Sequence, residues 1–456
     1  MAKPWMPRVS AEGAVVSAAE QEINALLALH PKGFDLSLGR ITRLLERLGN
    51  PHEQLPPVIH VAGTNGKGST STFCRAILEA HGLTVHVHTS PHLVNWHERF
   101  RLGAEGGGRL VEDAVLADAV RRVAAANQGE TITVFEILTA VMFVLFSEHP
   151  ADAALIEVGL GGRFDATNVI PHPAAAVIMS ISLDHQAYLG DRVELIAAEK
   201  AGIIKRGVPV VIGEQSEEIA RDVLIETAER LACPLDVYGQ NFIAFEENGR
   251  MVYQDEDELI DLPQPRLAGR HQQANAAAAI RALKAAGFKL EEQAIGRGLT
   301  SASWPGRLER LTYGRLVENL PEGVEIWIDG GHNPGAGRVI AEAMATLNDR
   351  ESRPLFLVSG MINTKDPIGY FEAFAGMARQ VFTVPVPDCE AGLDPRYLAD
   401  AAGQAGLRAG PAPDVETALA AICRSRDGST LPPRILIGGS LYLLGHVLRI
   451  NGTPPV

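Results

Sequence analysis

Short apolar runs alternate along most of the chain with segments whose apolar residues recur at helical spacing. Each run has the length of a strand buried on both faces, and strands separated by helices pair in parallel. The pattern therefore predicts an α/β fold with a mainly parallel sheet, and the number of runs indicates two such sheets. The predicted strands cover residues 58–62, 84–89, 154–158, 175–181, 208–212, 325–328, 354–358, 381–384 and 434–437.

Helical spacing and stop signals locate the connecting helices. Helices are predicted over 69–81, 112–126 and 272–286, and a glycine closes the first and the third of them, as is common at helix C-termini. Residues 137–146 are almost entirely apolar, but they make up about half of the ~20 residues that a membrane-spanning helix needs. Thr133 and Glu136 precede this run at the spacing of a capping box, which predicts a buried helix of a globular domain.

Two segments depart from the alternation. Residues 241–257 contain Asn248-Gly249, a dipeptide typical of tight hairpin turns, and are predicted to form a β-hairpin. Residues 301–306, Ser-Ala-Ser-Trp-Pro-Gly, interrupt a helical pattern before a new series of strands begins. We therefore predict a first domain of residues 1–303 and a smaller second domain of residues 304–456, within the two or three domains expected for 456 residues.

Composition narrows the class of protein. The chain has 41 Lys and Arg against 55 Asp and Glu, a net charge of −14, which argues against a general nucleic-acid-binding surface and leaves room for a local basic pocket. The start of the chain lacks the continuous apolar segment of a signal peptide. The four cysteines are scattered without a CxxC spacing, so neither a zinc knuckle nor a disulfide framework is indicated, and a reducing cytoplasm is favoured.

The most informative stretch is residues 59–72, an apolar strand that runs into a glycine- and lysine-rich turn and then a helix. Gly63, Gly66 and Gly68 let backbone N–H groups approach a polyphosphate, and Lys67 adds a positive charge. The stretch predicts a site for a nucleoside triphosphate, and the alternative is an ordinary glycine-rich turn. The commonest phosphate loop has a magnesium-binding hydroxyl directly after the lysine, whereas this chain has Gly68 there.

Polar residues at three other strand ends offer a replacement for that hydroxyl. Glu157 ends an apolar strand beside a glycine-rich loop, where a carboxylate can coordinate Mg²⁺ directly or through water. Ser90 closes a second strand and supplies a hydroxyl. His185 follows a third, as a metal ligand, a proton-transfer group or simply a strand-end histidine. The three side chains are predicted to converge, and a solvated carboxylate is the alternative for Glu157.

Seven motifs stand in order along the chain: His60-Val-Ala-Gly-Thr-Asn-Gly-Lys-Gly-Ser69, Thr89-Ser-Pro-His-Leu93, Glu157-Val-Gly-Leu-Gly-Gly-Arg163, Leu183-Asp-His185, Glu199-Lys-Ala-Gly-Ile-Ile204, Trp304-Pro-Gly-Arg-Leu308 and Asp329-Gly-Gly-His-Asn-Pro334. Together they resemble the ATP-dependent folylpolyglutamate synthases and dihydrofolate synthases of the Mur-ligase superfamily. The resemblance spans most of the chain. It implies an N-terminal P-loop ATPase domain and a smaller C-terminal Rossmann-like α/β domain that close over the substrates.

The resemblance also implies roles for single residues. ATP would be held by the loop residues Gly63, Thr64, Asn65, Gly66, Lys67, Gly68 and Ser69, and by Asn275, Arg307, Asp329 and His332. Magnesium would be bound by Ser90, Glu157, His185 and Lys200. The predicted catalytic residues are Lys67, Lys200 and His332. Lys200 matches a family lysine that CO₂ can convert to a metal-binding carbamate, although the sequence alone favours a surface lysine on a helix over 193–201.

Four residues are implied to contact the other substrates: Arg99, Arg163, Asp165 and Ser440. Arg99 and Ser440 match positions associated with the incoming glutamate, and a solvated arginine and a helix N-cap serine are the alternatives for them. The stretch 162–168 resembles the version in bacterial enzymes that accept dihydropteroate as well as folates, which predicts Asp165 near the pterin. Gly331 replaces a commoner alanine, a small change.

The implied reaction is ATP-dependent addition of L-glutamate to dihydropteroate, forming dihydrofolate, and to folates, through an acyl phosphate. The implied cofactors are ATP and Mg²⁺, as one or two ions, with a monovalent cation left open. The predicted protein is a cytoplasmic monomer that acts on small molecules, with no nucleic-acid or membrane partner. The alternatives are a folylpolyglutamate synthase without dihydropteroate activity, another Mur-type amino-acid ligase, for which too little chain precedes the phosphate loop, and a non-catalytic nucleotide switch, which leaves the motifs around Arg307 and Asp329 without purpose.

Overall fold

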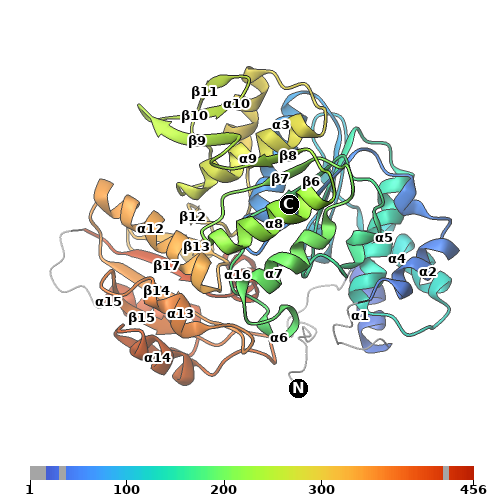
Figure 1. Cartoon of the computed structure of the whole chain (residues 1–456). Helices are drawn as coiled ribbons and strands as arrows, with labels where there is room; N and C mark the ends of the chain where they lie inside the picture. The colour runs from blue at the N-terminus through green and yellow to red at the C-terminus, as the bar shows by residue number, and fades with distance from the viewer. Residues whose placement is uncertain (1–16, 30–36, 425–430, 456) are drawn as a thin grey trace.

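Three sheets organise the protein (Figure 1). The computed structural model describes residues 17–29, 37–424 and 431–455, so the first 16 residues of the predicted N-terminal domain lie outside the described part. We call the part built on the eight-stranded sheet the first lobe and the part built on the six-stranded sheet the second lobe. A three-stranded sheet lies beside the first lobe (Figure 1).

The eight-stranded sheet has the order β4-β3-β2-β5-β1-β6-β7-β8. Its six strands from β2 to β8 in this order are parallel, and β3 and β4 add to the β2 edge in antiparallel fashion. The strands are β1 (Val58–Ala62), β2 (Val85–His88), β3 (Phe100–Leu102), β4 (Arg109–Leu110), β5 (Ala153–Glu157), β6 (Ala175–Ile178), β7 (Val210–Ile212) and β8 (Leu235–Val237).

Helices cover both faces of this sheet, because side chains that alternate along each strand need a partner on either side. Ile59 and Val61 of β1 pack with α3, α9 and α10, while Ala62 packs with α7 and α8 on the opposite face. The helices of the first lobe are α1 (Ala18–Leu29), α2 (Gly39–Arg47), α3 (Lys67–Ala80), α4 (Asp113–Asn127), α5 (Val134–Glu148), α6 (Gln186–Leu189), α7 (Val193–Lys200), α8 (Glu218–Arg230), α9 (His271–Ala285) and α10 (Glu292–Ser301). Short 3₁₀ turns are η1 (Pro51–Glu53), η2 (Trp96–Arg99), η3 (Ala166–Val169) and η4 (Ala201–Ile203).

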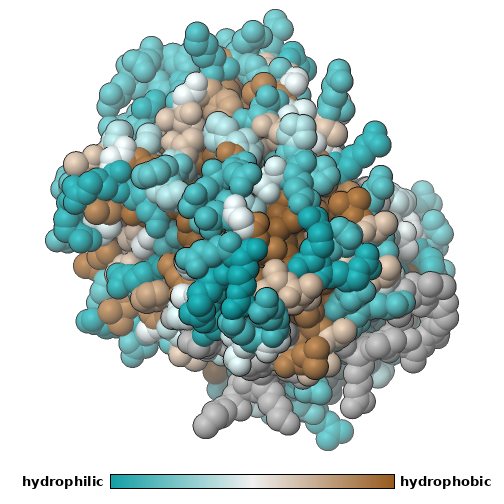
Figure 2. Space-filling view, turned by 90° about the vertical axis from the view of Figure 1, so that its right-hand side faces the viewer, coloured by the Kyte–Doolittle hydropathy of each residue, from teal (hydrophilic) through white to brown (hydrophobic). Residues whose placement is uncertain are grey.

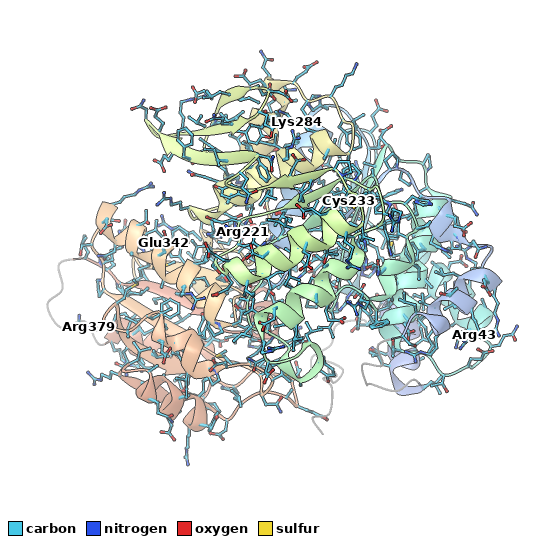
Figure 3. All side chains as sticks on the ribbon, in the orientation of Figure 1. Arg43, Arg221, Cys233, Lys284, Glu342 and Arg379 are labelled. Carbon is cyan, nitrogen blue, oxygen red and sulfur yellow. The ribbon has the colours of Figure 1, made fainter. Side chains whose placement is uncertain are left out.

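The predicted β-hairpin is confirmed and extended by a third strand. β9 (Phe242–Glu247), β10 (Arg250–Asp255) and β11 (Leu259–Leu262) form an antiparallel sheet. Lys284 of α9, labelled in Figure 3, fixes this sheet to the first lobe through an ion pair of 2.7 Å between its Nζ and Asp255 Oδ2. The Tyr253 hydroxyl donates to the same oxygen at 2.8 Å.

The six-stranded sheet of the second lobe has the order β12-β13-β17-β14-β15-β16, and all of its pairs except β12–β13 are parallel. Its strands are β12 (Glu309–Leu311), β13 (Glu325–Asp329), β14 (Leu355–Ser359), β15 (Ala378–Thr383), β16 (Ala409–Pro411) and β17 (Arg434–Gly438). Two apolar clusters, one on each face, join it to its helices. These are α11 (Arg315–Glu318), α12 (Pro334–Arg350), α13 (Pro367–Glu372), α14 (Pro395–Gln404), α15 (Val415–Arg424) and α16 (Leu441–Asn451).

The apolar run 137–146 lies within α5, which is buried along most of its length. The predicted capping box is present, since the Thr133 hydroxyl and the Glu136 carboxylate each bond to the backbone N–H of the other residue. In the described part of the chain no helix is both long and apolar enough to cross a membrane. The face shown in Figure 2 is mostly hydrophilic, with smaller apolar areas between the polar side chains.

The predicted α/β class and all nine predicted strands are confirmed, with ends that shift by a few residues. The strand predicted over 175–181 is wrong in its last three residues, because β6 ends at Ile178. The strands that the pattern missed are short: β3, β4, β8, β11, β12 and β16 have at most four residues each. Such short strands carry too few residues to show a periodicity of their own.

Candidate active site

A cavity of about 440 Å³ lies between the two lobes. On one side it is lined by residues that follow β1, β2, β5, β6 and β7, all at the carboxyl ends of strands of the eight-stranded sheet. On the other side it is lined by residues 329–332, which end β13 and follow it, and by α12 of the second lobe. The carboxyl ends of parallel strands are the usual place for a ligand site in such a sheet.

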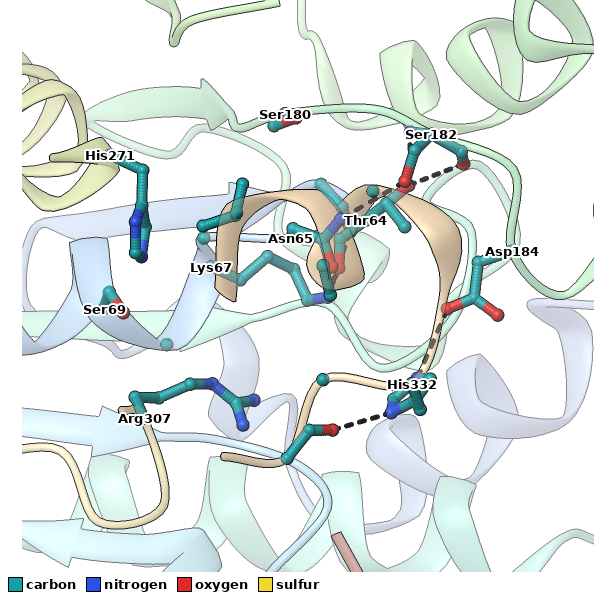
Figure 4. A pocket seen from close by; sticks show the side chains of 18 of the residues that line it. Thr64, Asn65, Lys67, Ser69, Ser180, Ser182, Asp184, His271, Arg307 and His332 are labelled. Atoms are coloured by element: carbon teal, nitrogen blue, oxygen red, sulfur yellow. Dashed lines mark hydrogen bonds and ion pairs between the residues drawn. The ribbon is translucent and has the colours of Figure 1, made fainter. Parts of the chain in front are cut away.

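The phosphate loop occupies the turn between β1 and α3. The backbone N–H groups of Thr64 and Asn65 donate to the Ser180 carbonyl at 2.8 and 3.1 Å, which fixes the loop to the end of β6. Lys67 begins α3, and its Nζ donates to the Gly63 carbonyl at 3.0 Å (Figure 4). The loop therefore presents a lysine and the positive end of a helix to the cavity, a combination that suits an anionic ligand.

Trp304 explains why position 68 is a glycine and not the usual serine or threonine. A Cβ atom at position 68 would lie 2.7 Å from Cε2 and Cζ2 of the Trp304 indole. A serine or threonine would collide with this rigid ring, so the site has no room for a hydroxyl directly after Lys67. A metal ligand must come from elsewhere in the cavity.

The four predicted metal ligands all line the cavity: Ser90, Glu157, His185 and Lys200. Glu157 is 6% exposed, and its Oε1 lies 3.7 Å from Lys67 Nζ. Burial raises the pKa of Glu157, whereas the charges of Lys67 and Arg307 favour its ionised form. A hydroxyl and a carboxylate are the oxygen ligands that Mg²⁺ prefers.

His185 holds a different position from a strand-end residue. It follows β6 by seven residues and adopts a left-handed backbone with φ 52° directly before α6. Burial, together with the charge of Lys365, lowers the pKa of His185 to about 3, so its imidazole is neutral and keeps a lone pair for a metal. Within the described residues, no three His, Cys, Asp or Glu side chains gather at a metal-binding distance. A metal here would therefore need the Ser90 hydroxyl, Lys200 or the bound phosphates as well.

Lys200 is not on the surface, so the interpretation favoured by the sequence alone is wrong. It ends α7, is 5% exposed, and donates from Nζ to the Gly63 carbonyl at 3.0 Å. Burial lowers its pKa to about 7, and the nearby Lys67 acts in the same direction. A neutral amine is the form that can react with CO₂.

Asp329 and Arg307 shape the wall that the second lobe contributes. Asp329 ends β13 and is 7% exposed, and its carboxylate accepts hydrogen bonds from the backbone N–H groups of Leu308 at 2.8 Å and Gly331 at 2.6 Å. Burial raises the pKa of Asp329, and the charge of Arg307 opposes this shift. The carboxylate thus fixes the two loops that bring Arg307 and His332 to the cavity (Figure 4).

His332 lies between two acceptors. Its Nδ1 is 2.9 Å from the Gly330 carbonyl, and its Nε2 is 3.4 Å from Asp184 Oδ2 (Figure 4). Burial and the charge of Lys365 lower the pKa of His332, while Asp184 and the Gly330 carbonyl oppose this shift. A neutral imidazole donates from only one nitrogen, so the ring donates to one of these two acceptors at a time.

Asn275 reaches the phosphate loop from α9. Its Nδ2 donates to Gln272 Oε1 at 3.0 Å, and Gln272 donates in turn to the Ser69 hydroxyl at 3.3 Å. All three residues line the cavity. Every residue that the sequence assigned to ATP or to the metal therefore lies in this cavity.

The four predicted substrate residues, Arg99, Arg163, Asp165 and Ser440, are not among the residues that line it. Arg99 Nε lies 3.0 Å from His92 Nδ1, the guanidinium lies 4.9 Å from the centre of the Trp96 ring, and burial lowers the pKa of Arg99 to about 10. Arg163 is 52% exposed at its side chain and contacts the Ala198 carbonyl at 3.4 Å. Their contacts with a substrate stay predictions.

Asp165 and Ser440 hold local structure. The Asp165 carboxylate accepts from the backbone N–H groups of Leu160 at 2.9 Å and Thr167 at 3.0 Å, and it is 3% exposed. The Thr167 hydroxyl also lies 2.9 Å from Nε2 of His60 on β1. Ser440 caps α16 by accepting from the Tyr442 backbone N–H at 3.2 Å, which is the alternative that the sequence left open.

Two residues that the sequence analysis did not assign are prominent here. Asp184 lines the cavity and stands inside the motif Leu183-Asp-His185, so the motif itself was the signal. Lys365, in the loop between β14 and α13, lies 2.6 Å from Asp184 Oδ1. No local pattern distinguishes Lys365 from an ordinary loop lysine.

Comparisons with known proteins agree with this arrangement. A family model described as the Mur ligase middle domain matches residues 61–283. The chain is 36% identical over 433 residues to the folylpolyglutamate synthase of Lacticaseibacillus casei, covering 90% of this chain and 92% of that protein. It is 37% identical over 324 residues to the dihydrofolate synthase/folylpolyglutamate synthase of Bacillus subtilis, covering 68% of this chain and 73% of that protein.

Solved structures resemble the whole chain. The structure of E. coli FolC in complex with DHPP and ADP superposes with a TM-score of 0.84 at 29% identity, covering 95% of this chain and 97% of that one. The Mycobacterium tuberculosis folylpolyglutamate synthase complexed with ADP gives a TM-score of 0.83 at 29% identity, covering 96% and 99%. The two-lobed arrangement of this chain is therefore that of nucleotide-binding proteins of known structure.

Proposed function

The chain belongs to the folylpolyglutamate synthase and dihydrofolate synthase family of Mur ligases, and we propose that it uses ATP to join L-glutamate to dihydropteroate, forming dihydrofolate, and to folates. The observation that carries this proposal is the cavity between the lobes. It combines a phosphate loop, a buried Glu157 3.7 Å from Lys67, and Arg307 and His332 from the second lobe. A carboxylate must be activated before an amine can displace one of its oxygens, and this set is suited to phosphoryl transfer.

In the first step the γ-phosphoryl group of ATP moves to the carboxylate of the pterin substrate, giving an acyl phosphate and ADP. Lys67 and Arg307 face the cavity and offset the negative charge that is shared among the phosphate oxygens. Lys67 comes from the first lobe and Arg307 from the second, so the step requires that the two lobes lie together, as they do here. Closure also keeps water away from the reactive acyl phosphate.

In the second step the glutamate amine, in its neutral form, attacks the activated carbonyl carbon. The C–N bond forms, the C–O bond to phosphate breaks, and the amine loses a proton as phosphate leaves. Arg307, which lines the cavity beside His332, is placed to hold the leaving phosphate. His185 is a proposed magnesium ligand with a pKa of about 3 and is therefore a weak base, so the proton passes to the departing phosphate or to water.

The residues that would hold magnesium are Ser90, Glu157, His185 and Lys200. The ion would supply positive charge next to the transferring phosphoryl group, as the relatives with bound Mn and AMPPNP suggest for their own sites. We propose that Lys200 becomes a carbamate, which turns a buried cation into an oxygen ligand. Its 5% exposure and its place beside the phosphate loop support this. A second ion and a monovalent cation belong to the same proposal.

The experiment that tests the function is phosphate release from ATP and Mg²⁺ with glutamate and each acceptor in turn. Release with both 7,8-dihydropteroate and a folate supports the two activities. Release with the folate alone supports a folylpolyglutamate synthase without dihydropteroate activity. Release that does not depend on glutamate would indicate a nucleotide switch, and release only with a peptidoglycan precursor would indicate another Mur-type ligase.

Three further points are proposals that accompany this function. The domain boundary lies at 303/304, supported by the change from α10, which ends at Ser301, to β12 of the second sheet, which begins at Glu309. The proposal also includes action as a monomer. The protein works in the cytoplasm on small molecules, without nucleic-acid or membrane partners. The cytoplasmic location is supported by the four cysteines, which all lie in the described residues and form no disulfide.

A further inference from the structure

The two lobes are joined by a buried ion pair beside the cavity. Asp184 belongs to the first lobe, and Lys365 to the loop after β14 of the second lobe, with 2.6 Å between Asp184 Oδ1 and Lys365 Nζ. The two side chains are 8% and 5% exposed. A buried charge costs free energy unless it is closely paired. Each of these two charges is paired only when the lobes lie together, so the ion pair favours that arrangement.

The other carboxylate oxygen of Asp184 also reaches across the boundary. Asp184 Oδ2 lies 3.4 Å from His332 Nε2 and accepts a hydrogen bond of 3.2 Å from Asn333 Nδ2. One first-lobe carboxylate therefore meets three groups of the second lobe. Although burial alone would raise the pKa of Asp184, His332 and Lys365 lower it, so the carboxylate is ionised.

The same cluster contacts the phosphate loop directly. Asn65 and Asn333 exchange two hydrogen bonds, with distances of 3.3 and 3.2 Å. Asn333 also caps α12, because its Oδ1 accepts from the Ala336 backbone N–H at 2.8 Å. The chain comes close enough here that a Cβ at Gly335 would lie 3.0 Å from the Ser182 hydroxyl oxygen and 3.2 Å from Asn65 Nδ2. The N-terminus of α12 thus rests on the phosphate loop.

We propose that Asp184 and Lys365 form an interlobe latch that positions His332 and Asn333 over the phosphate loop, which makes Lys365 a positioning residue for nucleotide binding and turnover. Lys365 does not itself line the cavity. It acts through Asp184, which it holds toward the second lobe. This inference rests on the proposed function only in requiring that a nucleotide binds between the lobes.

The test is the dissociation constant of a non-hydrolysable ATP analogue, measured with Lys365→Met, Lys365→Arg, Asp184→Asn and the double variant Asp184→Asn/Lys365→Met. Lys365→Met leaves the buried Asp184 carboxylate without its closest cationic partner, and we expect it to weaken nucleotide binding at least about tenfold. Lys365→Arg keeps the charge and should restore most of the affinity. The double variant should bind more tightly than the product of the two single effects predicts, since it leaves neither charge unpaired.

Small-angle X-ray scattering of the nucleotide-free protein reports the latch without any reaction. The radius of gyration should increase for Lys365→Met and stay at the wild-type value for Lys365→Arg. Lys289→Met is the matched control, because this exposed lysine follows the far end of α9 from the cavity. It should change neither quantity.

The proposal is overturned if Lys365→Met binds the analogue as the wild type does, or if the two single effects simply multiply in the double variant. An unchanged circular dichroism spectrum of Lys365→Met shows that each lobe remains folded. If the spectrum changes, the comparison of Lys365→Arg with the wild type replaces it as the test. Failure of the proposed function looks different, because it appears in the wild type as phosphate release that does not depend on glutamate, whereas failure of the latch leaves that dependence intact.

Discussion

The residues assigned to ATP and metal differ from those assigned to the other substrates in where they lie. Lys67, Glu157 and Lys200 line the cavity between the lobes, although both lysines also donate to the Gly63 carbonyl. Asp165 and Ser440 lie outside this cavity, and their side chains stabilise local structure. The Asp165 carboxylate accepts hydrogen bonds from the backbone N–H groups of Leu160 and Thr167, and the Ser440 hydroxyl caps α16.

The difference separates residues that contact a ligand in the cavity from residues that stabilise the fold around it. A charged group that faces a cavity acts on whatever occupies it, so its loss should reduce turnover and leave folding nearly unchanged. A buried group whose hydrogen bonds are all internal should show the opposite order, with folding affected first. The following variants test this separation, from the largest expected effect to the smallest.

Lys67→Ala should have the largest effect. It removes the positive charge beside Glu157 and the phosphate loop, and loss of one such electrostatic contact lowers kcat by about 10²–10³-fold. Because Lys67 is part of an open cavity wall, the melting temperature should change little. Steady-state phosphate release and calorimetry measure the two quantities, and the separation is broken if Lys67→Ala unfolds the protein while the folded fraction stays fully active.

Glu157→Gln should come next, with a shift in metal dependence. The amide keeps the shape of the side chain and loses the charge, so the Mg²⁺ concentration needed for half-maximal turnover should rise by about tenfold or more. The readout is a magnesium titration at saturating ATP. An unchanged titration curve would remove Glu157 from the set of metal ligands.

Asp165→Asn should affect stability more than turnover. An asparagine can offer only one oxygen to donors that now bond to two carboxylate oxygens, Oδ1 and Oδ2, and an unsatisfied buried donor costs about 1–3 kcal/mol. Chemical denaturation gives this value. A fully stable Asp165→Asn with a much higher KM for dihydropteroate would instead show direct contact with the pterin.

Ser440→Ala should cost about 1 kcal/mol of unfolding free energy through the lost cap of α16. Ser440→Thr keeps the hydroxyl and is the matched control. A KM for glutamate that rises strongly in Ser440→Ala but not in Ser440→Thr, without loss of stability, would move Ser440 to the group of direct contacts.

Arg163→Ala should have the smallest effect, within about 0.5 kcal/mol in stability. Its side chain is 52% exposed, and its nearest carboxylate contact, with Glu199, is 3.8 Å. Any substantial loss of turnover in this variant would show that Arg163 moves into the cavity when a substrate binds.

The sequence predicts the fold and which residues the cavity between the lobes brings together, for a physical reason. The phosphate loop, Glu157 and Asp329 lie in short motifs that follow buried strands, and parallel strands bring their carboxyl ends together in any α/β sheet. The short strands β3 and β16 carried no period long enough to detect. Neither the pairing of Asp184 with Lys365 nor the collision of a side chain at 68 with Trp304 follows from local pattern, because each depends on segments far apart in the chain.

The most direct test of the account is the mass of the product formed by the wild-type protein from ATP, Mg²⁺, L-glutamate and either 7,8-dihydropteroate or a folate. The account predicts that each acceptor gains at least one glutamyl residue, with one phosphate released per residue added and no product without glutamate. Phosphate release without a heavier acceptor would contradict it.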